Sequence, residues 1–392
     1  MRRRNSGRLL MGPGPSPVHP SVLAALGEPT LGHLDPEFLT IMGETMDMLR
    51  QVFGSDYKLT MPISGTGSAG MEASLVNLLE PGDHAVVTVI GTFGERMAEI
   101  AARCGAHVRR VDAEWGTPVD PAAVARAIDA GPAPKLVTVV HAETSTGVRQ
   151  PLAEIAALAD AAGALMVVDT VTSLGGMPIP IRQLGLDFVY SGTQKCLSCP
   201  PGLSPVTVSD RAMDVIQARR TPVHSWYLDL GLVQRYWGQE RFYHHTAPVN
   251  MIFALHEALA VLLAEGLDAV WQRHAANAAA LQVGLDALGL HPLVAPEYRL
   301  PSLVVVKVPA DVDEAAVRRH LLEQSNIEIG AGLGPLKGKI WRIGVMGHGS
   351  NRHNVTAVTS ALALALDAQG HRADVAAAMA AMDTAYLASV TG

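Results

Sequence analysis

Between residues 57 and 208, short apolar runs rich in β-branched residues alternate with stretches of helical periodicity. The apolar runs span residues 85–90, 136–140, 164–169, 187–190 and 206–208, and the helical stretches among them span residues 71–79, 94–103, 121–128 and 152–162. This alternation predicts an α/β layer in which helices cover the faces of a mostly parallel sheet. Ligands of such sheets bind at the carboxyl ends of the strands, so the residues that follow each apolar run are the first candidates for chemistry.

The pattern changes in the second half of the chain. A long helical stretch over residues 254–288 is followed by an apolar run at 303–308, a helix at 314–323, a strand at 340–343 and a helix at 354–366. This order predicts a smaller α+β domain. Because 392 residues exceed one compact core, we expect an N-terminal arm over residues 1–24, a large domain over 25–270 and a small C-terminal domain over 271–392.

Hydropathy does not predict a membrane protein. Hydrophobic residues make up 48% of the chain, and the mean hydropathy is +0.21. The most apolar stretches, residues 161–168 and 254–263, are too short or are interrupted by His256 and Glu257, whereas a membrane span needs about 18 to 20 apolar residues. We therefore expect no membrane partner.

The net charge and the N-terminal residues limit the possible partners and the expected location of the protein. The net charge of −7 comes without a basic stripe, which argues against nucleic acid as a partner. Arg2, Arg3 and Arg4 are not followed by an apolar segment, so they do not form a secretory signal, and a very short targeting arm is the alternative. We expect a cytoplasmic enzyme.

Cys196 and Cys199 form a CxxC pair, which is the spacing of many redox and zinc sites. The chain has only one other cysteine, Cys104, so no second pair completes a zinc site. Pro200 and Pro201 follow at once, where a thioredoxin-like helix would continue. The pair is therefore interpreted as structural.

A glycine-rich turn follows an extended segment and opens a helix. Gly65, Gly67 and Gly70 match the GxGxxG pattern of dinucleotide sites. Such sites also need an acidic residue at the end of the next strand, where this chain has glycine and threonine at residues 91–92. What remains is a helix N-terminus with the hydroxyls of Thr66 and Ser68, which suits a single phosphate or, alternatively, a simple capped turn.

Asp169 ends a buried apolar run. A carboxylate in that position is costly to desolvate unless it has a partner. It either caps the following helix or pairs with a pyridinium nitrogen, keeping that ring protonated and able to withdraw electrons.

Lys195 closes the polar turn of residues 191–195, directly after the strand expected at 187–190. It is one of six lysines and the one that follows a central strand. Burial lowers the pKa of a lysine and frees its amine for a Schiff base or for proton transfer. A surface lysine is the alternative.

Arg342 lies within the expected strand 340–343, between Trp341 and Ile343. On a strand it shares a face with Ile340, so its guanidinium needs an anion. A substrate carboxylate or an internal salt bridge would supply one. A phosphate turn, a pyridinium partner, a Schiff-base lysine and a carboxylate clamp are together explained by pyridoxal 5'-phosphate (PLP) and its substrate.

These residues stand among motifs that resemble the alanine–glyoxylate and serine–glyoxylate aminotransferases, in the class V branch of the fold type I PLP enzymes. The matching segments are GPGP at residues 12–15, the turn at 64–70, HAETSTG at 141–147, VDTVTSLGG at 168–176, YSGTQKCL at 190–197, YHHTAP at 243–248 and RIGVMG at 342–347. The resemblance implies a fold type I PLP-dependent transferase, with a large domain built on a mostly parallel, seven-stranded sheet flanked by helices and a smaller C-terminal α+β domain.

The resemblance also implies residue roles. Lys195 is the Schiff-base lysine and proton shuttle, Asp169 pairs with the pyridine nitrogen, and Arg342 clamps the substrate carboxylate. The phosphate is bound by Thr66, Gly67, Ser68 and Gln194, together with Tyr243 and Thr246 of the neighbouring subunit of a homodimer. The ring of Phe93 stacks on the cofactor, and Thr144 and Val171 contact its hydroxyl and its ring face.

The implied reaction is transamination from alanine or serine to glyoxylate, giving glycine and a 2-oxo acid. Asn250 and His33 are polar residues at positions where substrate contacts are expected, and they would suit (S)-ureidoglycine as an alternative donor. A cysteine desulfurase is excluded because no cysteine follows Cys199. An NAD-dependent dehydrogenase and a non-catalytic PLP-binding protein are the more remote alternatives.

Overall fold

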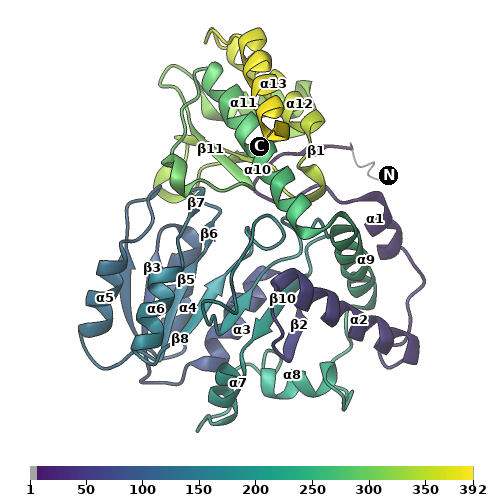
Figure 1. Cartoon of the computed structure of the whole chain (residues 1–392), viewed down its shortest axis with the longest axis vertical. Coiled ribbons are helices and arrows are strands. Elements are labelled where there is room, and N and C mark those ends of the chain that lie inside the picture. The colour runs from purple at the N-terminus through teal and green to yellow at the C-terminus, as the bar shows by residue number, and fades with distance from the viewer. Residues whose placement is uncertain (1–6, 392) are drawn as a thin grey trace.

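In the computed structural model, residues 7–391 are described, so the arginines at residues 2–4 lie outside the described part. The chain forms a broad layer around a large sheet, and a second group of strands and helices lies at one end of it (Figure 1). This arrangement confirms the α/β fold expected from the sequence.

The large sheet has seven strands in the order β2-β10-β9-β8-β5-β3-β4. Their bounds are Leu59–Ser64 for β2, His84–Val89 for β3, His107–Asp112 for β4, Leu136–Val140 for β5, Leu165–Asp169 for β8, Phe188–Tyr190 for β9 and Leu203–Val208 for β10. Only β10 runs against its neighbours, and all other pairings are parallel. The mostly parallel, seven-stranded sheet is therefore confirmed.

Helices cover the large sheet in neighbouring pairs. α3 packs against α4, and α5 packs against α6 (Figure 1). The helices of this layer are α1 Pro20–Leu26, α2 Pro36–Phe53, α3 Gly67–Leu78, α4 Thr92–Arg103, α5 Pro121–Asp129, α6 Ala153–Ala161, α7 Asp210–Gln217 and α8 Leu230–Trp237. A short hairpin of β6 Ala142–Glu143 and β7 Val148–Arg149 follows β5.

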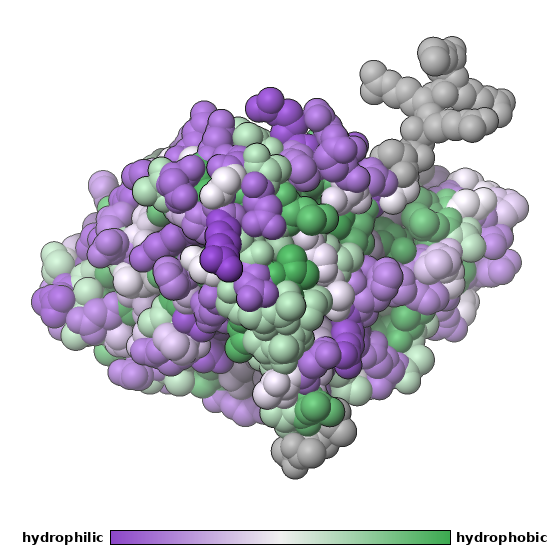
Figure 2. All heavy atoms as spheres, turned by 90° about the horizontal axis from the view of Figure 1, so that it is seen from above, coloured by the Kyte–Doolittle hydropathy of each residue, from purple (hydrophilic) through white to green (hydrophobic). Residues whose placement is uncertain are grey.

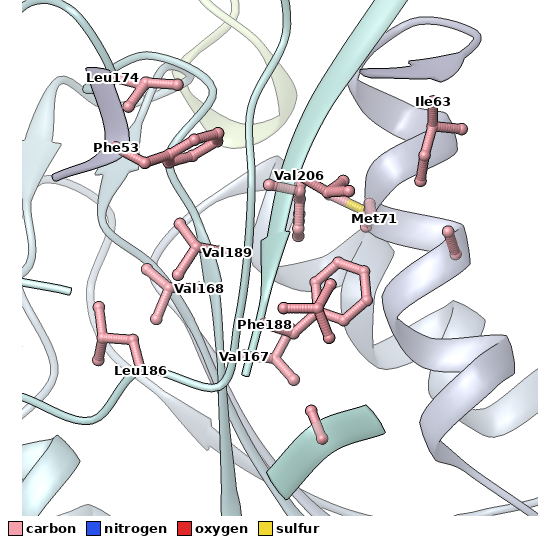
Figure 3. Packing of buried hydrophobic residues seen from close by; sticks show 14 of the residues in the cluster. Phe53, Ile63, Met71, Val167, Val168, Leu174, Leu186, Phe188, Val189 and Val206 are labelled. Atoms are coloured by element: carbon pink, nitrogen blue, oxygen red, sulfur yellow. The ribbon is translucent and has the colours of Figure 1, made fainter. Parts of the chain in front are cut away.

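The core of the large layer forms where the middle strands meet the covering helices. Val167 and Val168 of β8 and Phe188 of β9 are fully buried, and Met71 reaches in from α3 (Figure 3). Because both faces of the sheet are covered, these strands are buried along their whole length and, apart from Asp169 at the end of β8, show no polar alternation. Such packing makes the central strand ends rigid supports for the residues that follow them.

The helical stretch expected over residues 254–288 is two helices, α9 Val249–Glu265 and α10 Leu267–Ala287. Gly266, with φ of 87°, joins them at an angle of 85°. Within residues 7–391, no single helix is both long and apolar enough to cross a membrane, although this bent pair would meet the criterion if it were counted together.

The second group of elements begins with α10 and has its own small sheet. Three strands pair in the order β11-β14-β13, and β1 near the N-terminus pairs with β12. The bounds are β1 Leu9–Leu10, β11 Leu303–Lys307, β12 Ile327–Glu328, β13 Gly330–Ala331, β14 Ile340–Gly344, α11 Glu314–Gln324, α12 Arg352–Asp367 and α13 Val375–Thr391, with 3₁₀ turns at Pro296–Tyr298, Gly334–Leu336 and Gly347–Gly349.

Helix α10 connects the two groups. Val270 belongs to the large hydrophobic cluster, whereas Leu281 and Leu285 belong to a second cluster shared with α12 and α13. On the face seen from above Figure 1, hydrophobic residues lie in small groups among hydrophilic ones (Figure 2). Residue 270 lies inside α10 and residue 24 inside α1. The domain limits at these two positions stay a prediction.

Candidate functional site

Five strands of the large sheet that run in the same direction end at one edge of it, and candidate residues lie at or just after each of these ends. The turn at residues 64–70 follows β2, and Phe93 follows β3. The segment 141–147 follows β5, Asp169 closes β8, and the turn at 191–195 follows β9. Parallel strands bring their carboxyl ends to one edge of a sheet, which is where ligands of α/β folds bind. The sequence pattern therefore predicted the location of these segments correctly.

Lys195 is buried and is enclosed by the N-terminal segment of the chain. Its side chain is 7% exposed, and Nζ donates a hydrogen bond to the carbonyl of Pro13. The hydroxyl of Ser16 donates to the carbonyl of Lys195 at 2.6 Å. Gly14 has φ of +102°, and a side chain there would meet Nζ at 2.7 Å. The GPGP segment thus supports the lysine directly, a contact that the sequence pattern alone did not indicate.

The electrostatic surroundings of Lys195 favour its neutral amine. Burial lowers the pKa of Lys195 to about 8, and the positive charge of Arg342 acts in the same direction. The carboxylates of Asp169 and Glu143 oppose this shift. A lysine with this pKa has a much larger neutral fraction near physiological pH than an ordinary lysine, and a nucleophile or proton acceptor needs that neutral form.

Asp169 is a buried carboxylate held by two hydrogen bonds. Its side chain is 2% exposed, Oδ1 accepts from the backbone N–H of Val171 at 2.8 Å, and Oδ2 accepts from the hydroxyl of Tyr190 at 2.8 Å. Burial raises the pKa of Asp169 to about 7, while these hydrogen bonds oppose the rise. No cationic side chain in the described part of the chain is bonded to this carboxylate, which makes it a good partner for a cationic ring nitrogen.

Tyr190 is a residue of this site that the sequence analysis did not single out. It is fully buried at the end of β9, where it is the register partner of Asp169. Side chains of register partners on neighbouring strands lie on the same face of the sheet. A register assignment for β8 and β9 would therefore have been the signal that found it.

The glycine turn lies against the turn that follows β9 and contains Gln194. A side chain on Gly67 would meet Val171 at 3.0 Å, and one on Gly192 would meet Oε1 of Gln194 at 3.0 Å. Oε1 of Gln194 is buried and has no hydrogen-bond partner among the described residues. Thr66 caps α3 without using its side chain. The turn is therefore a narrow cradle with an unused polar group beside it.

Ser68 and Phe93 are both linked to an arginine on α4. Ser68 is exposed and accepts a hydrogen bond from Arg96 at 3.1 Å. The guanidinium of Arg96 lies 5.1 Å from the centroid of the Phe93 ring. Sequence reasoning missed this arginine, which adds a positive charge beside the cradle and suits an anion there.

Arg342 occupies the middle of β14 as expected, and it is 7% exposed. Its Nε donates to the carbonyl of Ala331 at 2.7 Å, and Nη1 donates to the carbonyl of Thr144 at 3.1 Å. Within residues 7–391, no carboxylate forms an ion pair with it. Burial lowers the pKa of Arg342 to about 10. The alternative of an internal salt bridge is thus not realised, and the guanidinium is open to an external anion.

The YHHT segment is tied to the glycine turn by histidines. Nε2 of His245 lies 3.0 Å from the hydroxyl of Ser64, and Nδ1 of His245 lies 2.8 Å from Nδ1 of His244. Nε2 of His244 lies 3.3 Å from the carbonyl of Trp226, which can only accept. His244 therefore carries its proton on Nε2, His245 carries its proton on Nδ1, and Ser64 donates. Burial lowers the pKa of His245 to about 4, which keeps the imidazole of His245 neutral near physiological pH.

The four remaining candidates lie near this histidine chain and along α9. Tyr243 is 50% exposed, its hydroxyl lies 3.4 Å from that of Thr246, and its ring centroid lies 4.9 Å from that of His33. Asn250 donates to the carbonyls of Leu26 and Glu28 and accepts from Thr30. Its amide is therefore engaged in holding the loop before α2, and its role in substrate binding stays a prediction.

The surroundings of the CxxC pair are those of structural, unreactive cysteines. Cys196 and Cys199 are buried and free, and burial raises the pKa of each thiol to about 12. Across the described residues, no group of three or more histidine, cysteine, aspartate or glutamate side chains could hold a metal ion.

Comparisons with known proteins identify the family of this chain. A family model described as aminotransferase class-V matches residues 13–339. The alanine–glyoxylate aminotransferase of Callithrix jacchus is 42% identical over 363 residues, which cover 92% of this chain and 87% of that protein. The solved alanine–glyoxylate aminotransferase of Nostoc sp. is 47% identical with a TM-score of 0.92, covering 93% and 97% of the two chains. The solved ureidoglycine–glyoxylate aminotransferase of Bacillus subtilis is 39% identical with a TM-score of 0.96, covering 98% and 100%.

Proposed function

This chain belongs to the class V aminotransferases, and on that premise we propose that it moves the amino group of alanine or serine onto glyoxylate, giving glycine and a 2-oxo acid. The observation that carries the proposal is Lys195, a buried lysine whose pKa is lowered to about 8, chiefly by burial, at the carboxyl edge of the sheet. Asp169 and Arg342 supply the two other charged groups that transamination of an amino acid requires.

Class V aminotransferases depend on PLP, and the residues of this chain fit that cofactor. The cradle at Gly67 suits a phosphate, together with Thr66 and Ser68 and with the NH₂ of Gln194, whose Oε1 has no partner among the described residues. Asp169, to which no cationic side chain of residues 7–391 is bonded, suits the ring nitrogen. Lys195 would hold the aldehyde carbon covalently, and Phe93, Thr144 and Val171 would surround the ring. When bound, PLP stabilises negative charge that develops on the α-carbon of the substrate.

Lys195 also acts on the substrate proton in this proposal. Its neutral Nζ accepts the proton of the α-carbon and later returns it to the product. The carbonyl of Pro13 receives a hydrogen bond from Nζ, which limits the directions in which the amine points. Burial of the side chain keeps water from competing for this proton.

Arg342 binds the carboxylate of donor and acceptor alike. Two of its donors are fixed by backbone carbonyls at residues 331 and 144, so the guanidinium has one orientation. A bidentate carboxylate adds geometric selectivity as well as energy. Both alanine and glyoxylate carry such a carboxylate, so one clamp serves both halves of the reaction.

We further propose that the enzyme is a homodimer in which Tyr243 and Thr246 reach the phosphate of the neighbouring subunit. Exposed aromatic side chains gather around α8, with Trp226 60% exposed and Phe242 56% exposed. Large exposed aromatic groups of this kind mark protein interfaces. Light scattering should give twice the chain mass of 41.4 kDa, and a monomer would contradict the dimer.

The free state of all three cysteines supports a cytoplasmic location, where thiols stay reduced.

Ureidoglycine is the second candidate donor, favoured by the likeness to the Bacillus subtilis enzyme. A donor with an amide-like group would use polar residues such as Asn250 and His33. The amide of Asn250 is already bonded to residues 26, 28 and 30, which supports alanine or serine as the first candidates. Ureidoglycine stays the alternative.

A panel of amino donors tests the proposal. Purified protein loaded with PLP is incubated with glyoxylate and with alanine, serine or ureidoglycine, and glycine is measured. We expect glycine from alanine or serine, and a loss of at least about a thousandfold in the Lys195→Ala variant. Turnover with ureidoglycine alone would replace the first candidate with the second. PLP binding without turnover of any donor would indicate a non-catalytic protein.

A further inference from the structure

Glu143 is a buried acid next to the site that takes no part in the chemistry described above. It ends the short strand β6 and is 0% exposed. Its Oε1 accepts hydrogen bonds from the backbone N–H of Ser145 at 3.0 Å and from the hydroxyl of Ser145 at 2.6 Å. Its Oε2 accepts from the backbone N–H of Phe93 at 3.2 Å. One carboxyl group therefore joins two loops that follow different strands.

The hydrogen-bond pattern fixes the role of each partner. The hydroxyl of Ser145 accepts from the backbone N–H of Thr92 at 3.0 Å and donates its own proton to Oε1 of Glu143. Burial raises the pKa of Glu143, whereas the hydrogen bonds donated by Ser145 and by the backbone N–H of Phe93 act against this rise and favour the carboxylate. The fit is close, because a side chain on Gly91 would meet Cδ of Glu143 at 2.6 Å.

These contacts provide hydrogen-bond acceptors for the first backbone N–H groups of α4. The first N–H groups of a helix have no partner inside the helix, and an anion beside them is favourable. Gly91, the residue before α4, offers no side chain for a cap. Glu143 and Ser145 supply from another loop what the helix lacks in its own sequence.

The same short segment also reaches the carboxylate clamp. Thr144 lies between Glu143 and Ser145, and its carbonyl accepts a hydrogen bond from Nη1 of Arg342 at 3.1 Å. A displacement of Glu143 would move this carbonyl along with the backbone. The tripeptide 143–145 therefore connects the residue expected to face the cofactor ring with the residue expected to bind substrate.

We propose that Glu143 is a positioning residue, whose carboxylate fixes the first turn of α4 and thereby sets Phe93 and Arg342 relative to each other. The inference rests on the proposed function, because this alignment matters only if a cofactor ring lies beside Phe93. Glu143 does not touch the reacting atoms in this account. It acts through the two loops that it joins.

The charge of Glu143 gives the inference a readout apart from activity. Around it lie Lys195, Asp169, Arg342 and the phenol of Tyr190. Burial lowers the pKa of Lys195, and the negative charge of Glu143 opposes this effect by raising that pKa. Removing that charge should therefore make it harder for Nζ of Lys195 to hold a proton.

The test is a Glu143→Gln variant loaded with PLP and titrated by visible absorbance without substrate. Glutamine keeps the size but places an NH₂ against either Ser145 or the N–H of Phe93. We expect the pH midpoint of the visible band to fall by about 0.5 unit or more and the visible circular dichroism to weaken, because the ring loses its fixed neighbour. The kcat should fall more than the affinity for the amino donor, since Arg342 keeps its charge.

Glu80→Gln is the matched control. Glu80 is 6% exposed and accepts from the backbone N–H groups of Arg220 and Thr221 and from the hydroxyl of Thr221, none of which belongs to the site. This variant should lower the melting temperature but leave the midpoint and the dichroism of the bound cofactor unchanged. Equal spectral effects in both variants would mean that any buried glutamate produces them and would overturn the inference.

Ser145→Ala provides a second variant that keeps the charge. We expect it to weaken the visible dichroism without lowering the midpoint, and it decides the question alone if Glu143→Gln fails to fold. Wild-type spectra in Ser145→Ala and in a folded Glu143→Gln would overturn the positioning role. A wild-type protein that binds no PLP at all would instead contradict the proposed function, so the two failures are distinguishable.

Discussion

Lys195, Asp169 and Arg342 are all buried, and across residues 7–391 none of them pairs with an oppositely charged side chain. Burial of an ionisable group without a partner is costly, so such groups are retained where a ligand supplies the missing charge. Burial lowers the pKa of Lys195 to about 8 and raises the pKa of Asp169 to about 7. At the residue scale, the unpaired charges indicate a ligand with both an acidic and a basic end.

The sequence predicted the positions of these three residues but not the residues that support them. Asp169 and Lys195 follow apolar runs, and that is visible in a single chain. Tyr190 and Glu143 act through hydrogen bonds to residues 21 and 50 positions away. Their partners depend on which strands are neighbours, and an apolar run does not specify its neighbour.

Tyr190→Phe tests the support of Asp169. The variant removes the hydrogen bond to Oδ2 from a fully buried site, so Asp169 should become harder to ionise and a weaker partner for a cationic ring. We expect kcat to fall about tenfold and the free energy of unfolding to fall by about 1–3 kcal/mol.

Tyr386→Phe serves as the control for that variant, because its hydroxyl bonds to Asn277 in the second group of elements. Steady-state kinetics and PLP titration measure both variants. An unchanged kcat in Tyr190→Phe, or an equal loss in Tyr386→Phe, would argue against this role of the tyrosine.

At the element scale, the differences from the expected pattern have local causes. Strand β4 was not expected, because it lies at the edge of the sheet and carries polar residues such as Arg109 and Arg110. Edge strands are covered on fewer sides and need fewer apolar residues. The helical stretch over residues 254–288 divides at Gly266, which adopts a positive φ that other residues avoid. Periodicity alone continues across such a break.

Helix α10 is fastened to the loop after β14 by His274. Nδ1 lies 2.7 Å from the carbonyl of Val270 and so carries the proton, while Nε2 accepts from the backbone N–H of Gly347 at 2.9 Å. The imidazole must be neutral for both bonds to form, and burial lowers its pKa to about 4. Protonation would place an N–H against that of Gly347.

This arrangement predicts a pH dependence of stability. Between about pH 6.5 and pH 4 the unfolded chain binds a proton at His274, whereas the folded chain does not. The free energy of unfolding therefore falls as the pH falls through that window. The loss should approach about 3 kcal/mol at the acid end. His274→Gln should be less stable than the wild type at pH 7.5 but lose less stability on acidification. Parallel denaturation profiles across this range would refute the assignment.

At the scale of the whole molecule, the site joins parts of the chain that are far apart in sequence. Pro13 contacts Lys195, and Thr144 contacts Arg342 across 198 positions. The α/β fold and the mostly parallel sheet were predicted from the alternation of apolar runs and helical stretches, membership of the class V aminotransferases was predicted from motifs, and all three are confirmed. The contacts between the N-terminal segment and Lys195 could not be predicted, because they depend on how separately folded layers pack together, and the domain limits stay a prediction.

Reductive trapping tests the central claim that this fold holds PLP on Lys195. The protein is loaded with PLP, treated with borohydride to reduce a Schiff base to a stable amine, digested, and mapped by mass spectrometry. We predict that the phosphopyridoxyl group is found on the peptide that contains Lys195 and on none of the other five lysines. A label on another lysine, or no label on a protein that turns over amino donors, would contradict the account.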